Sequence, residues 1–175
     1  MRQDGLTLIE LLIVITIIGI LIVVSGFEFS GWMARYKVES EIKDLYTDLS
    51  NARTLAMQRN INYFLRLNSA ATKEYSAYED TNNDDACCAG DTKIGRLSKQ
   101  NRSHDIAWNG GGVVDIGMDR RGIFEPSTAP LGINIWLLKD DGTTYGNSEV
   151  DYDCIVIAPT RISMGKYDGA TCQAK

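Results

Sequence analysis

Oxygen-bearing side chains alternate along the segment 80–91, which reads DTNNDDACCAGD. Four of them stand at positions 1, 3, 5 and 12 of that segment: Asp80, Asn82, Asp84 and Asp91. Ca²⁺ takes several oxygen ligands from a loop that curls around it, so this spacing predicts a calcium site. Position 6 is Asp85, where calcium loops use glycine, and position 12 is an aspartate, where a glutamate is usual. An acidic turn that faces solvent explains the same residues, and the sequence leaves both interpretations open.

A run of basic side chains follows, with no acidic residue among them: Lys93, Arg96, Lys99, Arg102 and His104. Together with Arg120, Arg121 and a nearby Trp108 that can stack on a base, such a run is typical of a surface that binds anions or DNA. A solvated basic loop that balances an acidic domain is the other interpretation. The chain has a formal net charge of -5 and a pI near 4.9, which argues against a general binder of polyanions.

All four cysteines lie after residue 86, which is compatible with an oxidising compartment and with disulfides. They are Cys87, Cys88, Cys154 and Cys172, and four cysteines allow three connectivities. Zinc binding is disfavoured because the sequence has no Cys-x-x-Cys pair and His104 is its only histidine. Because there is also no nucleophile motif and no phosphate-binding loop, we expect that the protein is not an enzyme and has no cofactor besides the calcium considered above.

Glu10 is the only charged residue in the apolar segment 6–24. As a helix this segment would be about 28 Å long, close to the roughly 30 Å hydrocarbon core of a bilayer, so we expect a transmembrane helix. Arg2 ahead of it favours a cytoplasmic N-terminus. A carboxylate at the centre of a bilayer costs on the order of 2.5–3.5 kcal/mol. Glu10 therefore either reaches the headgroups, takes up a proton or pairs with a cation.

The elements that position these residues follow from composition and periodicity. With 44% apolar and 23% charged residues, wholesale disorder and a polytopic membrane protein are both excluded. Residues 25–60 keep a helical period, with one face that is predicted to pack in a core: Val38, Ile42, Leu45, Leu49, Ala52 and Ala56. The other faces carry mixed charges, among them Glu41 and Asp48, and are predicted to face solvent. The sequence thus predicts an amphipathic stem helix after the apolar segment.

From residue 61 onward the period becomes roughly two, which predicts a mostly antiparallel β head over 61–175. The strand candidates are rich in β-branched and aromatic residues: 61–68, 74–79, 105–108, 113–118, 133–138 and 154–158. Turn signals separate them at 69–71, 109–112, 121–122 and 141–142. The expected fold class is α+β, with a long N-terminal helix packed on an antiparallel head.

The run Gly5-Leu6-Thr7-Leu8-Ile9-Glu10-Leu11-Leu12-Ile13-Val14-Ile15 resembles the type III signal of prepilins and pseudopilins. The resemblance implies that residues 1–5 are a leader, which a prepilin peptidase cuts off after Gly5. It also implies N-methylation of the new N-terminal residue, Leu6. In this family the glutamate at the position of Glu10 is thought to pair with the N-terminal amine of a subunit in a growing filament, so Glu10 would be an assembly residue.

The rest of the chain is similar in its layout to GspH/FimT-like minor pilins. The likeness runs from TLAMQRN at the end of the stem to Arg161-Ile162-Ser163-Met164-Gly165-Lys166 after the last predicted strand. It implies a single-pass inner-membrane protein with a periplasmic head, which assembles with other pilin or pseudopilin subunits in a pilus or pseudopilus. A C-terminal disulfide in many pilins implies a Cys154–Cys172 bridge, which leaves Cys87 with Cys88.

Two other functions remain open at the level of sequence. FimT-like proteins of some competence systems bind DNA through a basic Gly-Arg-x-Arg tail, and here the comparable place reads Met164-Gly165-Lys166-Tyr167-Asp168. A DNA-uptake subunit that uses Lys93, Arg96, Lys99 and Arg102 is therefore one alternative. The other is a membrane-anchored periplasmic binding domain that never polymerises. The sequence does not distinguish a type IV pilus, a type II secretion pseudopilus and a competence pilus as the host machine.

Overall fold

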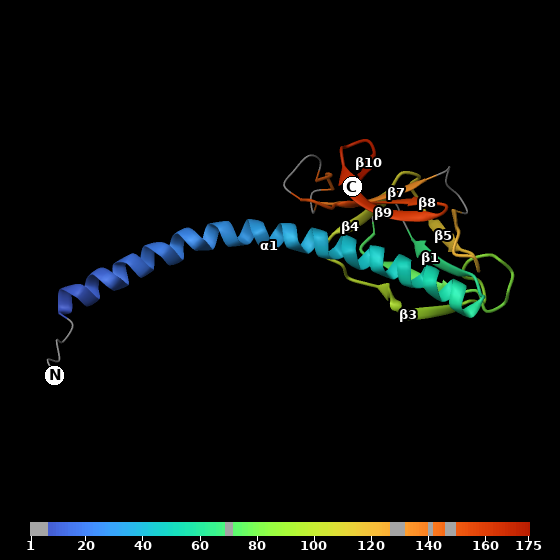
Figure 1. Ribbon diagram of the computed structural model, residues 1–175, viewed down its shortest axis with the longest axis horizontal. Coiled ribbons are helices and arrows are strands. Elements are labelled where there is room, and N and C mark those ends of the chain that lie inside the picture. The colour runs from blue at the N-terminus through green and yellow to red at the C-terminus, as the bar shows by residue number, and fades with distance from the viewer. Residues whose placement is uncertain (1–6, 69–71, 127–131, 140–141, 146–149) are drawn as a thin grey trace. The chain divides into compact units, whose positions relative to one another are not determined.

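The computed structural model describes residues 7–68, 72–126, 132–139, 142–145 and 150–175, and for residues 24–30 it describes the backbone alone. The chain divides into two compact units, Met1–Tyr36 and Lys37–Lys175. The second unit combines the last part of the long helix with all of the strands (Figure 1).

A single helix, α1, runs from Leu8 to Arg59. It begins after Thr7, whose hydroxyl accepts a hydrogen bond from the amide of Glu10 at 3.4 Å, as expected of an N-cap threonine. It ends where Asn60 takes a left-handed conformation with a φ of 56°, which asparagine tolerates at a helix C-terminus. The absence of proline from residues 1–125 lets this helix continue through the stem predicted over 25–60.

The described residues of the second unit form ten strands in two five-stranded antiparallel sheets. The first sheet has the order β3-β2-β1-β5-β6 and contains β1 (Tyr63–Leu67), β2 (Tyr75–Glu79), β3 (Thr92–Lys99), β5 (Val114–Met118) and β6 (Phe124–Pro126). The second has the order β10-β9-β8-β7-β4 and contains β4 (Asp105–Trp108), β7 (Ile133–Leu138), β8 (Cys154–Ala158), β9 (Arg161–Tyr167) and β10 (Cys172–Ala174). The predicted α+β class is therefore confirmed.

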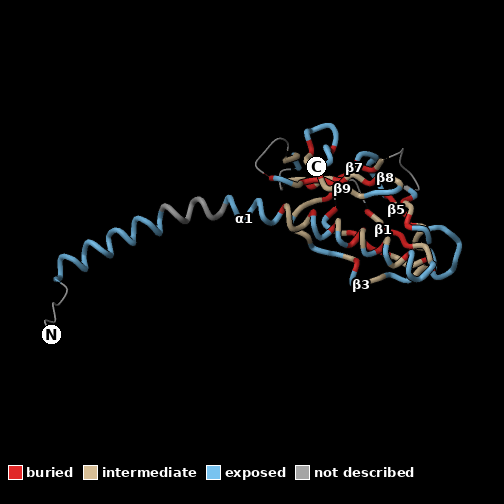
Figure 2. The backbone as a smooth tube through the Cα atoms, viewed as in Figure 1, coloured by how far each residue is buried: buried red, intermediate tan, exposed pale blue. Residues whose placement is uncertain are grey.

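One apolar core joins α1 to both sheets within the second unit. All six residues of the predicted stem face, Val38, Ile42, Leu45, Leu49, Ala52 and Ala56, are buried in it, and Figure 2 shows the buried positions recurring along this part of α1. The strands contribute alternate side chains, as in β7, where Ile133, Ile135 and Leu137 are buried and the residues between them are half-buried. Across β1 and β5, Arg66 makes a two-pronged ion pair with Asp115 at 2.6 and 2.7 Å.

The structure corrects two expectations about the head and the stem. Residues 92–99, which are not among the predicted strands and which one interpretation placed in a solvated basic loop, form strand β3 at the edge of the first sheet. The faces of α1 beside the apolar stripe are not fully solvated, because Asp48 is buried and Glu41 is half-buried. Tyr75 of β2 donates a hydrogen bond from its hydroxyl to Asp48 Oδ2 at 2.7 Å, which satisfies this buried carboxylate.

Candidate functional site

The first turn of α1 carries the acidic residue that the sequence singles out. Glu10 occupies the third position of the helix, and its amide bonds to both the carbonyl and the hydroxyl of Thr7. A carboxylate in a first turn interacts favourably with the positive end of the helix dipole. No side chain among the described residues pairs with this carboxylate. Gly5 and Leu6, the residues of the predicted cleavage and methylation, lie outside the described residues.

After that turn, α1 carries apolar side chains on all of its faces as far as Val23. Every large apolar residue from Leu8 to Val23 is exposed in the isolated chain, from 82% at Leu8 to 48% at Val14. The Thr16 hydroxyl donates to the carbonyls of Leu12 and Ile13 at 3.0 and 2.8 Å, so it needs no partner outside the helix. A helix that is apolar all round is normally covered by lipid or by other protein. Among the described residues, no helical stretch has the length and apolarity needed to cross a membrane.

The acidic segment forms the loop between β2 and β3, and it brings three of the four predicted calcium ligands together. One carboxylate oxygen from each of Asp80, Asp84 and Asp91 lies within 4.8 Å of the other two. Asn82 supports the arrangement, because its amide nitrogen donates to Asp84 Oδ2 at 2.8 Å and to the Ala89 carbonyl at 2.9 Å. Its amide oxygen accepts from the Asp84 amide at 3.2 Å, so the side chain of Asn82 is fully engaged within the loop.

The predicted basic surface divides into two parts. Lys93, Arg96 and Lys99 are exposed along the edge strand β3, where charged side chains also oppose pairing with another sheet. Arg102 and His104 do not belong to this exposed set, because both side chains are nearly buried against Glu41 of α1. Trp108 is 5% exposed and donates its indole N–H to the carbonyl of Gly112, so it is not available to stack on a base.

Glu41, Arg102 and His104 form a polar cluster that the sequence analysis missed. An Arg102 guanidinium nitrogen lies 3.1 Å from Glu41 Oε2 and 2.9 Å from the Glu41 carbonyl, and His104 Nδ1 lies 3.3 Å from the same Oε2. The amide of Ser103 donates to the other carboxylate oxygen at 2.9 Å. Burial opposes the charge of Glu41, but the contact with His104 and the charge of Arg102 outweigh it and lower the pKa of Glu41 to about 2.

Disulfides join Cys154 to Cys172 and Cys87 to Cys88. The first links β8 to β10 across β9, with a Cα–Cα distance of 6.0 Å. Trp136 and Tyr167 stack near it with ring centroids 4.5 Å apart, and both belong to the small apolar cluster around this disulfide. Cys87 and Cys88 approach Asp115, but their sulfurs are joined in a disulfide and are therefore not thiolates that could bind a metal ion.

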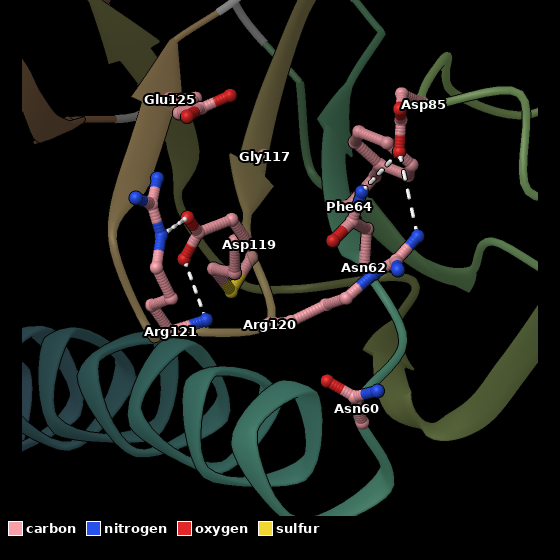
Figure 3. A pocket seen from close by; sticks show the side chains of 10 residues that line it. Asn60, Asn62, Phe64, Asp85, Gly117, Asp119, Arg120, Arg121 and Glu125 are labelled. Carbon is pink, nitrogen blue, oxygen red and sulfur yellow. Dashed lines mark hydrogen bonds and ion pairs between the residues drawn. The ribbon is translucent and has the colours of Figure 1, made fainter.

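A polar hollow of about 720 Å³ opens between the end of α1, the first sheet and the β2–β3 loop (Figure 3). It is lined by Asn60, Asn62, Phe64, Asp85, Gly117, Met118, Asp119, Arg120, Arg121 and Glu125. Space at Gly117 is tight, because a Cβ atom would lie 3.0 Å from the Glu125 carbonyl and 3.4 Å from the Phe64 ring. The lining therefore combines one aromatic wall with charged side chains of both signs.

Ion pairs join Arg121 to Asp119 and Arg120 to Asp85 in the lining of this hollow. Arg121 Nε lies 2.7 Å from Asp119 Oδ2, and Asn62 and Arg120 both approach Asp85 from the opposite side (Figure 3). Burial opposes the charge of Asp119, but the amide of Ile123 and the side chain and amide of Arg121 lower its pKa. The described lining thus offers carboxylates, guanidinium groups and amides that can form hydrogen bonds and ion pairs with a bound group.

The comparisons with known proteins address the N-terminal segment. Residues 1–26 match the family model of the prokaryotic N-terminal methylation motif. No curated protein matches this chain. No solved structure matches it either. The matched residues include Gly5, Leu6 and Glu10 in the order that a prepilin requires, and the motif therefore supports a type IV pilin-like prepilin that is processed and assembles with pilin subunits.

Proposed function

We propose that this protein is a minor type IV pilin or type II secretion pseudopilin, a structural subunit rather than an enzyme. In this proposal a prepilin peptidase removes residues 1–5, Leu6 is N-methylated, and the mature chain assembles into a pilus or pseudopilus. The single observation that carries the proposal is the methylation motif over residues 1–26, with its glutamate in the first turn of a 52-residue helix.

Glu10 has the position that such an assembly requires. Cleavage after Gly5 leaves a free amine at Leu6, four residues before Glu10 and just ahead of the helix that begins at Leu8. The Glu10 carboxylate lacks a partner among the described side chains and is surrounded by exposed apolar residues. In apolar surroundings an unpaired carboxylate is costly, so a neighbouring subunit that supplies an amine stabilises the packed state.

The apolar half of α1 supports the same proposal. Its exposed side chains from Leu8 to Val23 need apolar surroundings, which the inner membrane provides before assembly and other subunits provide afterwards. We propose a single-pass topology with the N-terminus in the cytoplasm and the head in the periplasm, where an oxidising compartment accounts for the two disulfides. The head then presents its loops and the polar hollow to neighbouring subunits or cargo.

The processing step is tested by intact mass spectrometry of the full chain, purified from membranes with and without a co-expressed prepilin peptidase. We expect a peptidase-dependent loss of Met1–Gly5 and the gain of one methyl group on Leu6. Retention of residues 1–5 under both conditions would contradict the proposal and favour the anchored binding domain that never polymerises.

The assembly step is tested by Glu10→Gln, which keeps the size of the side chain and removes its charge. We expect the variant to be cleaved normally but to be lost from the sheared filament fraction, by at least about tenfold if one charged pair in apolar surroundings is removed. Thr16→Val is the matched control, because the Thr16 hydroxyl is satisfied inside the helix, and we expect it to assemble like the wild type. Equal incorporation of Glu10→Gln and wild type would show that Glu10 is not an assembly residue.

A further inference from the structure

We propose that the β2–β3 loop binds one Ca²⁺ through the carboxylates of Asp80, Asp84 and Asp91. The site is separate from the N-terminal segment on which the proposed pilin function rests. Oxygen ligands of one Ca²⁺ lie about 2.3–2.6 Å from the ion, so two of them are at most about 5 Å apart. The three carboxylate oxygens in this loop meet that condition, because all lie within 4.8 Å of one another.

Asp80 shows that the cluster is more than an acidic turn on the surface. Its residue is only 1% exposed, and its Oδ1 is buried without a hydrogen-bond partner among the described residues. Its Oδ2 accepts one long bond from the Asp85 amide at 3.3 Å. A buried carboxylate oxygen without a donor is costly, and a cation placed among the three carboxylates supplies what the protein does not.

Asp91 repeats this arrangement from the other end of the loop. Its Oδ2 accepts a hydrogen bond from the Cys88 amide at 2.6 Å, which fixes the orientation of the carboxylate. Its Oδ1 is buried and has no hydrogen-bond partner in the described part of the chain. Asp80 directly follows β2, and Asp91 directly precedes β3. Because these two strands are paired, each aspartate approaches the cluster from a fixed end of the loop.

The three carboxylates have no basic side chain as a partner in the part of the chain that the structure describes. Among the described residues, no lysine or arginine lies within 4.0 Å of Asp80, Asp84 or Asp91. Arg120 approaches the neighbouring Asp85 instead, and Arg59 pairs with Glu79. Three carboxylates at this spacing repel one another unless a cation or protons intervene, and a hard divalent cation matches an all-oxygen set.

The backbone at position 6 of the calcium spacing has the conformation that calcium loops require, although the residue there is not glycine. Asp85 stands where glycine is usual, and it takes the left-handed conformation, with a φ of 57°, that glycine provides in such loops. Aspartate tolerates this region better than most residues. Asn82 is a positioning residue rather than a ligand, since its amide holds Asp84 and the Ala89 carbonyl. The flexible geometry and mixed ligands of Ca²⁺ suit this loop better than the strict octahedron of Mg²⁺.

Binding of Ca²⁺ would also act on the polar hollow. Asp84 is followed directly by Asp85, whose carboxylate accepts a hydrogen bond from Asn62 and faces Arg120 in the wall of the hollow (Figure 3). A cation that fixes Asp84 therefore fixes the placement of Asp85 as well. With calcium bound, Asp85 would keep its place in the wall of the hollow. Without calcium, the position of Asp85 would vary, and the shape of the hollow would vary with it.

The test is calorimetric titration of Ca²⁺ into the full-length protein in detergent micelles after treatment with a chelator. We expect one site per chain, with an affinity between that of intracellular sensors and the roughly 10⁻⁴–10⁻³ M of extracellular modules. Asp80→Asn and Asp91→Asn should weaken binding at least tenfold. Asp44→Asn is the control, because it removes one exposed carboxylate from α1 outside this loop, and it should bind within about threefold of wild type.

A thermal melt distinguishes loss of the site from loss of the fold. Calcium at a hundred times its dissociation constant multiplies the folding equilibrium constant of the wild type by about 100. Asp80→Asn should lose this calcium-dependent stabilisation. Its chelator-treated form should melt at or above the temperature of the chelator-treated wild type, because the substitution removes a buried unpaired charge. The proposal is overturned if about 10 mM Ca²⁺ produces neither heat nor a melting shift, if Asp80→Asn and Asp91→Asn bind like wild type, or if Mg²⁺ binds equally well.

Discussion

Glu41 lies beside the apolar stripe of α1, and its carboxylate receives Arg102, His104 and the amide of Ser103 from the chain ahead of β4. The resulting pKa of about 2 is below the ordinary value of 4.5, so the charged form is favoured in the folded state. A carboxyl with a lowered folded pKa stabilises the protein above its unfolded pKa. That contribution is lost as the pH falls from about 4.5 towards about 2.

Glu41→Gln tests this contribution. At pH 7 we expect a loss of about 3 kcal/mol in the free energy of unfolding, because the variant leaves Arg102 buried without its counter-charge. We also expect a shallower fall in stability between pH 5 and pH 2 than in the wild type. Urea unfolding at several pH values measures both effects. Asp44→Asn, an exposed carboxylate on the same helix, should change neither, and a similar pH profile for both variants would refute the assignment.

Tyr75→Phe tests the buried hydrogen bond to Asp48. The variant keeps the ring and removes the hydroxyl that donates to Asp48 Oδ2 at 2.7 Å. We expect a loss of about 1.5–3 kcal/mol, the usual range for a hydrogen bond to a charged group, because the carboxylate remains buried. Tyr78→Phe on the same strand is the control, since Tyr78 is only half-buried. Equal unfolding free energies for the two variants would mean that water satisfies Asp48 in solution.

At the scale of elements, the packing of α1 rests on its apolar stripe. Leu49 is fully buried in the core shared with the sheets, so Leu49→Ala should cost about 2–5 kcal/mol in unfolding free energy. Asn51→Ala, two residues further on an exposed face, should change it by less than about 0.5 kcal/mol. Denaturant unfolding of both variants measures the contrast. Similar stabilities would mean that the helix does not depend on this face.

The sequence predicts elements best where one physical requirement governs many residues. The stem stripe from Val38 to Ala56 and strand β7 follow directly from burial of one face, and both appear in the structure. Strand β3 was missed because an edge strand meets solvent on most sides, so its lysines and arginine obscure the period of two. Short strands such as β6 and β10 carry too few residues for a period to show.

The sequence predicts that functional side chains lie close together in space only where they are also close along the chain. The spacing of Asp80, Asp84 and Asp91 raised the possibility of one shared site, and their carboxylate oxygens lie within 4.8 Å of one another. The burial of Asp80 could not be predicted from this spacing, because it depends on the sheet beneath the loop. The cluster of Glu41 with Arg102 and His104 joins residues about 60 positions apart, and no local pattern in the sequence indicates such a contact.

At the scale of the whole molecule, the two disulfides stabilise the fold to different extents. Cys154–Cys172 has a sequence separation of 18, and the chain-entropy model gives about 3 kcal/mol for a loop of that size. The Cys154→Ala/Cys172→Ala double variant should lose about that much unfolding free energy in urea. Cys87→Ala/Cys88→Ala is the control, because adjacent residues enclose no loop, and it should lose much less. A larger loss in the control would show that the vicinal pair holds the β2–β3 loop.

The Cys154–Cys172 bridge also determines what happens to the chain after proteolysis. It spans β9 and the turn near Asp168, so a single cut anywhere in 155–171 leaves two fragments that remain covalently attached. On an unreduced gel such a nicked chain migrates with the intact one, and only a reducing agent separates the C-terminal piece. A chain cut there therefore keeps β10 attached, and the cut can be detected only after reduction.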